Sequence, residues 1–105
     1  MTDLEINGRC AKAMGFIAVE VNIHPISKKK YVFIQCGPDD GYTYGPLHDD
    51  AQAMALVKKF NIHCIRKDKK WWANCEGGLF KNGALNQDLN RAICECVAKM
   101  QKEKA

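Results

Sequence analysis

The chain has 105 residues, of which 47% are hydrophobic and 27% are charged, and its formal net charge is +4. These values suit one ordinary globular domain and exclude a disordered, fibrous or membrane-embedded chain. The apolar runs are too short to cross a bilayer, and no stretch has the pattern of a secretory signal. We therefore expect one domain over residues 1–105, located in the cytoplasm.

The first predicted element is a helix that begins at Thr2 and ends near Met14. Thr2 and Glu5 have the spacing of a capping box, in which both side chains accept hydrogen bonds from backbone N–H groups at a helix start. Gly15 follows and can adopt the left-handed conformation that ends many helices.

Two strands are expected next. Residues 16–24 alternate apolar and polar side chains, which is the pattern of a half-buried strand. Residues 31–36 are apolar on both faces, as in a more central strand. A basic turn at residues 28–30 separates the two segments, so they should form a hairpin. Residues 37–45 are rich in turn formers and are predicted to be a loop.

Residues 46–60 predict a second helix. Asp49 and Gln52 form a second capping pair, and acidic residues at the start and lysines at the end complement the helix dipole. Asn61 is a suitable left-handed C-cap. The side chains expected to form the buried stripe of this helix are Ala53, Met54, Val57 and Phe60.

A second hairpin and a third helix are predicted for the rest of the chain. Residues 62–66 and 71–75 are short β-type segments joined by a basic turn. Residues 76–87 are rich in Gly and Asn and are predicted to be a loop, after which Asp88 caps the helix. The buried face of that helix is predicted to consist of Leu89, Ala92, Ile93, Cys96, Val97 and Met100.

The predicted order is α-β-β-α-β-β-α, which indicates an α+β fold. Because hairpins make neighbouring strands antiparallel, we expect a mainly antiparallel four-stranded sheet packed with three helices as a sandwich. A β-β-α unit occurs twice in outline, without a convincing repeat in the sequence itself.

Four segments resemble the small accessory proteins of tailed enterobacterial phages and prophages that carry the phage ABA-sandwich domain. These segments are residues 2–7, residues 46–60, Trp71-Trp72 and residues 88–101, which together cover roughly half of the chain. The resemblance implies an α+β fold, a phage origin and, from the family's name, three layers. It implies no activity and no catalytic residues.

The chemistry-bearing residues do not form a recognisable active site. Without an export signal, the six cysteines should remain reduced thiols, and most should be buried. His63 and Cys64 are neighbours on a predicted strand, so they point to opposite faces and cannot pair. Possible metal ligands lack the paired spacing of zinc sites, so we predict no metal, cofactor or catalytic residue. These possible ligands are Cys36, His48, His63, Cys64 and Cys75.

The strongest candidate site is the second hairpin turn, where four cations lie beside two tryptophans. Trp71 is in phase with Ala73 and Cys75 and should face the core, whereas Trp72 lies on the opposite face. Three interpretations stay open: a soluble turn that protects a sheet edge, a protein contact, or a nucleic-acid contact. If the two hairpin turns share one end of a sheet, their cations form one patch. The candidate contact residues are Arg66, Lys67, Lys69, Lys70, Trp72, Lys28, Lys29 and Lys30.

The function expected from these observations is non-enzymatic binding. We predict a phage or prophage accessory protein in the cytoplasm of a bacterial host, which binds a host protein and so acts in host takeover or against host defence. The alternative is a nucleic-acid-binding protein that uses the basic hairpin turns and Trp72. No membrane partner is expected.

Overall fold

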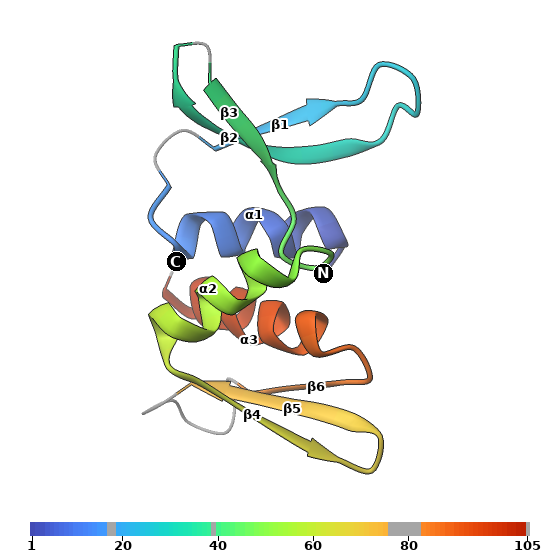
Figure 1. The fold of residues 1–105 in the computed structure, drawn as a ribbon, viewed down its shortest axis with the longest axis vertical. Coiled ribbons are helices and arrows are strands. Elements are labelled where there is room, and N and C mark those ends of the chain that lie inside the picture. The colour runs from blue at the N-terminus through green and yellow to red at the C-terminus, as the bar shows by residue number, and fades with distance from the viewer. Residues whose placement is uncertain (17–18, 39, 76–82, 105) are drawn as a thin grey trace.

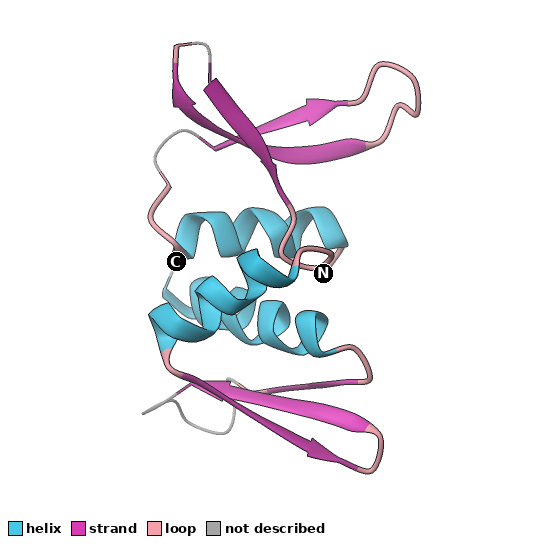
Figure 2. Ribbon diagram, in the orientation of Figure 1, coloured by secondary structure: helices cyan, strands magenta, loops and turns pink. Residues whose placement is uncertain are grey.

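The computed structural model describes residues 1–16, 19–38, 40–75 and 83–104. Within these residues there are three helices and two three-stranded antiparallel sheets (Figures 1 and 2). The prediction of an α+β fold is confirmed, but the prediction of one four-stranded sheet is wrong. The elements are α1 (Asp3–Ala13), β1 (Val19–Ile23), β2 (Lys30–Gly37), β3 (Asp40–Tyr44), α2 (Asp50–Phe60), β4 (Ile62–Lys67), β5 (Lys70–Cys75), β6 (Ala84–Asn86) and α3 (Leu89–Lys104).

The helices lie between the two sheets, with the β1-β2-β3 sheet at the top of Figure 1 and the β4-β5-β6 sheet at the bottom. α1 packs against β1 and β2 on one side and against α3 on the other. α3 also packs against β5 and β6, and α2 packs against α3 and β4. The longest dimension, 42 Å, therefore runs from one sheet through the helices to the other.

Each predicted hairpin has a third strand that the sequence pattern did not reveal. Residues 37–45 were expected to form a loop, but β3 lies within them and pairs with β2. The predicted loop over residues 76–87 contains β6, which pairs with β5, while its residues 76–82 lie outside the described part of the chain. These strands are short and contain turn-forming residues, so their structure depends on pairing with a strong neighbour and not on their own propensity.

The predicted helix caps are confirmed, and with them the start of α2 after Asp49. The backbone N–H of Glu5 donates to the Thr2 hydroxyl at 3.2 Å, and that of Gln52 donates to the Asp49 carboxylate at 3.0 Å. α2 therefore begins at Asp50. Residues 46–49 form a turn before the helix and not its first turn.

The buried stripe of α2 differs from the predicted one by one important exchange. Ala53 is buried, and Val57 and Phe60 pack partly against the core, as predicted. Met54, however, is 49% exposed, whereas Leu56 is fully buried. The reason is that α2 packs against both α3 and β4. The face of the helix that carries Ala53 and Leu56 is the one covered by these neighbours.

Asn61 ends α2 in the left-handed conformation that the sequence predicted, with φ 51° and ψ 54°. Replacing Asn61 with Ala should lower the free energy of unfolding by about 1 kcal/mol, because a Cβ-bearing residue without a short polar side chain is strained there. Asn61→Gly should cost nothing measurable, since Gly adopts this conformation freely. Urea denaturation of both variants tests the prediction, and equal losses would contradict it.

α3 is buried on almost every side because it lies between α1 and the second sheet. Cys94 and Cys96 point in directions about 200° apart on a helix, and yet both are fully buried. Ala98 is fully buried as well, although it lies outside the predicted stripe. α1 and α3 are joined at their exposed margin by Arg91, which donates to Asp3 at 2.7 Å and to Glu95 at 2.8 Å.

Candidate binding surface

The face of the β4-β5-β6 sheet that points away from the helices carries a cross-strand row of apolar side chains. Ile65 is paired with Trp72, and Trp72 is paired with Leu85. Ile65 is 57% exposed and Leu85 is 52% exposed. We call this row of Ile65, Trp72 and Leu85 the outer apolar row. Its members share one face because side chains directly opposite each other in a ladder project to the same side.

The two tryptophans point to opposite faces, as predicted. Trp71 packs partly against the hydrophobic core, and Ala73, two residues further along the strand, is completely buried. Trp72 lies in the outer apolar row and is half-buried. This alternation follows from the period-two geometry of a strand.

The position of the Trp72 ring depends on Gly83. A Cβ atom at Gly83 would lie 2.1 Å from Cζ2 and 2.3 Å from Cη2 of Trp72, so the six-membered ring occupies the space that a side chain would need. The Gly83 carbonyl accepts a hydrogen bond from Nζ of Lys99 on α3 at 3.1 Å. A glycine at the start of β6 therefore allows Trp72 to lie close against the backbone of the outer face.

The β4-β5 turn brings cations to one end of the outer apolar row. Asp68 and Lys69 have φ of 52° and 64°, which is the geometry of the tight turn that suits a twisted hairpin. A hollow of about 510 Å³ lies at this end, lined by Lys67, Asp68, Lys70, Trp72 and Leu85. An apolar, partly aromatic surface is thus bordered by two ammonium groups.

Arg66 does not belong to this surface. Its guanidinium carbon lies 5.5 Å from the centre of the Trp71 ring, in a cation–π arrangement. Because Trp71 faces the helices, Arg66 is directed to the inner side of the sheet. The sequence grouped Arg66 with Trp72, but strand alternation separates them.

The second basic turn lies on the other side of the helices, in the β1-β2 hairpin (Figure 1). The two hairpins thus belong to different sheets, and the condition for one continuous patch, a shared sheet end, is not met. The turn is ordered by His24, whose Nδ1 accepts hydrogen bonds from the backbone N–H groups of Ile26 and Ser27 at 3.2 Å each. Lys28 within it has φ 61°.

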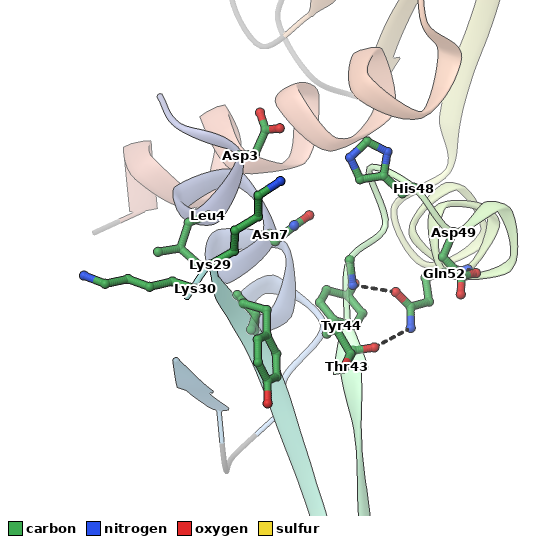
Figure 3. A pocket seen from close by; sticks show the side chains of 13 residues that line it. Asp3, Leu4, Asn7, Lys29, Lys30, Thr43, Tyr44, His48, Asp49 and Gln52 are labelled. Atoms are coloured by element: carbon green, nitrogen blue, oxygen red, sulfur yellow. Dashed lines mark hydrogen bonds between the residues drawn. The ribbon is translucent and has the colours of Figure 1, made fainter. Parts of the chain in front are cut away.

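Lys29 and Lys30 border a cavity of about 590 Å³ between the start of α1, the first sheet and the β3-α2 connection (Figure 3). Gln52 closes one side, accepting from Gly45 N at 2.8 Å and donating to Thr43 O at 3.3 Å. Asp3 and Asp49 also line this cavity. Since both signs of charge are present, the cavity does not select one charged ligand.

The described thiols are not arranged for nucleophilic chemistry. Cys10 is fully buried and its Sγ donates to Cys94 O at 3.5 Å. Its hydrogen bond with Cys94 and its burial raise the pKa of the Cys10 thiol far above the ordinary value. Burial also raises the pKa of Cys64. Nucleophilic thiols need a lowered pKa, so these two groups stay protonated and unreactive.

The possible metal ligands are not gathered into one site in the part of the chain that the structure describes. No group of three or more His, Cys, Asp or Glu side chains there could hold a metal ion. His63 and Cys64 are consecutive residues of β4, as predicted. The side chains of Cys36 and Cys75 lie outside the described part.

Comparisons with protein-family models, curated proteins and solved structures find no match for this chain. The resemblance to phage accessory proteins therefore stays a prediction. Among the described residues, no helix has the length and apolar character needed to cross a membrane.

Sequence reasoning identified Trp72 and the lysines of its turn but missed two members of the outer apolar row. Ile65 could have been found, because it is in phase with His63 and Lys67 and thus shares their exposed face. Leu85 could not, because it lies on β6, and its stretch of sequence predicted a loop.

Proposed function

We propose that this chain is a non-enzymatic binding protein that contacts another protein through the outer apolar row and the adjoining Lys67 and Lys70. The observation that carries the proposal is the exposure of Ile65 and Leu85 on either side of Trp72. A contiguous apolar patch on the outside of a sheet, here two exposed side chains on either side of a half-buried tryptophan, is a feature of interaction sites.

The chemistry of this surface favours a protein partner with acidic groups around an apolar centre. Tryptophan is enriched among the residues that dominate interface energies, particularly where neighbouring contacts exclude water. Ile65 and Leu85 provide such neighbours. Lys67 and Lys70 stand at the margin, where charges mainly accelerate association and select partners of opposite sign.

The biological setting that we propose comes from the resemblance and not from the geometry. The chain acts as an accessory protein of a phage or prophage, in the cytoplasm of the bacterial host. It binds a host protein and alters host metabolism or defence. The raised pKa values of Cys10 and Cys64 support a function without thiol catalysis.

Single-stranded nucleic acid is the alternative partner, and one observation favours it. The half-buried Trp72 ring lies next to Lys67 and Lys70, so a base could stack on the ring while the ammonium groups contact phosphates. The separation of the two basic turns by the helices weakens this alternative, because one strand of nucleic acid cannot follow a continuous basic path between them.

The double variant Ile65→Lys with Leu85→Lys should reduce partner recovery at least about tenfold, because it places two charges in the centre of the apolar contact. Affinity purification of the tagged protein from an infected host, followed by mass spectrometry, measures this loss. Met54→Lys is the matched control, since Met54 is also exposed but lies on α2. Unchanged recovery by the double variant would disprove the proposed surface.

Nuclease treatment of a parallel sample separates the two kinds of partner. Recovery that survives nuclease supports a protein contact, whereas recovery that is lost supports nucleic acid. Labelled single-stranded DNA and RNA then provide a direct test by gel mobility at low salt. A shift that disappears in the Lys69→Glu and Lys70→Glu variant would replace the protein proposal with the nucleic-acid one.

A further inference from the structure

β1 is an edge strand whose inner face is only partly covered. It is hydrogen-bonded to β2 alone among the described strands of its sheet, so its other side presents free backbone N–H and C=O groups. Val21 is paired with the buried Val32 and shares its inward face. Nevertheless, Val21 is 55% exposed and Ile23, two residues further along, is 57% exposed.

A groove of about 400 Å³ lies between this edge and α1. Its apolar lining comes from Leu4 of α1 and from residues of β1 and β2, namely Val19, Val21 and Val32. Gly8 lies in the α1 wall, and a Cβ atom built there meets nothing within 4 Å. The groove is therefore open space at the place where side chains of a further strand beside β1 would project toward the helices.

Two cations and one acidic residue give the groove a net positive charge. Arg9 and Lys12 line it, and Glu5 is the acidic residue of the lining. An occupant that brings a carboxylate would therefore complement this charge.

We propose that an extended segment of a partner protein adds to β1 as a fourth strand of the first sheet. Its backbone hydrogen-bonds to the free edge of β1, as in other cases of strand addition. Its alternate side chains point into the groove, with apolar groups against Val21 and Gly8 and a carboxylate beside Arg9 and Lys12. This site lies on the opposite side of the helices from the outer apolar row and is independent of it.

A second copy of this chain is a poorer occupant than a foreign segment. If β1 paired with β1 of another molecule, the side chains entering the groove would come from Val19, Val21 and Ile23 of that molecule. Glu20, the acidic residue of β1, points to the other face of the sheet because neighbouring residues alternate. Such a pair would place no carboxylate beside Arg9 and Lys12, whereas a partner strand with an inward carboxylate would.

The test uses a fluorescein-labelled peptide of seven residues with the sequence Thr-Val-Thr-Val-Thr-Asp-Thr. In an extended peptide the two valines and the aspartate share one face, and the threonines share the other. Fluorescence anisotropy with the full chain should show saturable binding. In NMR spectra, the backbone amides of β1 should show the largest shifts. A peptide with lysine in place of aspartate should bind at least about tenfold more weakly, because it repels Arg9 and Lys12.

Gly8→Leu should fill the groove and weaken binding of the aspartate peptide at least about tenfold, while the open space around Gly8 allows the chain to fold. Val21→Lys should weaken it as well, because the exposed Val21 side chain lines the groove. Ile26→Lys is the matched control, since Ile26 lies in the turn, is 86% exposed and does not line the groove. Circular dichroism and thermal melts confirm that each variant is folded.

Three results would overturn the proposal: no saturable binding, equal affinity for the aspartate and lysine peptides, or unchanged affinity in folded Gly8→Leu. Sedimentation of the chain without peptide then measures its oligomeric state. A dimer that Gly8→Leu dissociates would show that a second copy occupies the groove, which also contradicts a foreign segment as the occupant.

Discussion

Replacing Leu56 with Ala should lower the free energy of unfolding by about 2–5 kcal/mol. Leu56 is fully buried in the centre of α2, where the helix packs against α3 and β4. The loss combines the transfer of the missing carbon atoms with the cavity that remains, because the surrounding helices and strand can collapse only partly. Urea denaturation followed by circular dichroism measures this change.

Met54→Ala is the control for this experiment, because both substitutions shorten a large apolar side chain in the same helix. Met54 is 49% exposed, so its loss should change the free energy of unfolding by no more than about 0.5 kcal/mol. If Met54→Ala cost as much as Leu56→Ala, the helix would have the orientation that the sequence pattern predicted, and the observed packing would be wrong.

Alkaline pH should destabilise the protein more steeply than is usual for a small domain. The Cys10 thiol has a pKa raised far above its ordinary value of 9.0 by its hydrogen bond with Cys94 and by burial. Above pH 9 the unfolded chain releases this proton, whereas the folded chain retains it. Stability is thus full below pH 9 and falls by about 1.4 kcal/mol per pH unit above it.

Tyr44 adds a second contribution of the same sign. Burial, followed by nearby thiols of Cys10 and Cys94, raises the pKa of its hydroxyl above the ordinary value of 10.0. From pH 10 upward, both groups should contribute, so the free energy of unfolding should fall by about 2.7 kcal/mol per pH unit. Denaturant titrations between pH 8 and pH 11 would show this increase in slope.

Two variants separate these contributions, and their slopes with pH are more informative than their absolute stabilities. Cys10→Ala should remove the decline that begins near pH 9. Tyr44→Phe should remove the additional decline above pH 10 and cost little at neutral pH, because the buried Tyr44 hydroxyl has no hydrogen-bond partner among the residues that the structure describes. Slopes that both variants leave unchanged would contradict the burial of these groups.

The local features of the fold could be predicted from sequence because they depend on neighbouring residues. The caps at Thr2, Asp49 and Asn61 are set by backbone geometry within four residues, and all three are confirmed. The β4-β5 hairpin is confirmed for the same reason, since its strands are adjacent and joined by a tight turn.

The sheet arrangement could not be predicted, because it depends on contacts between distant segments. β3 contains a glycine, and β6 has only three residues. No period-two pattern therefore distinguishes these two strands from loops. One indication of the layering was present in the sequence. Cys94 and Ala98 are apolar on the side of α3 away from the predicted stripe, which indicates a second covered face beside the polar margin of Arg91, Glu95 and Lys99.

The candidate site was predicted in part for similar reasons. Phase along one strand was enough to place Trp72 outside and Trp71 inside. Pairing between strands determined that Leu85 lies beside Trp72. The position of Lys28–Lys30 on the other side of the helices depends on the division of the strands into two sheets, which no local pattern contains.

The position of α3 has a consequence for the way in which the chain becomes folded during synthesis. α3 leaves the ribosome after the other described helices, yet it forms one wall for α1 and another for the β4-β5-β6 sheet. Until residues 89–104 emerge, both of these apolar faces are without their main cover. The nascent chain therefore depends on residues 89–104 to complete this core, and the apolar faces of the earlier segments are open to aggregation until then.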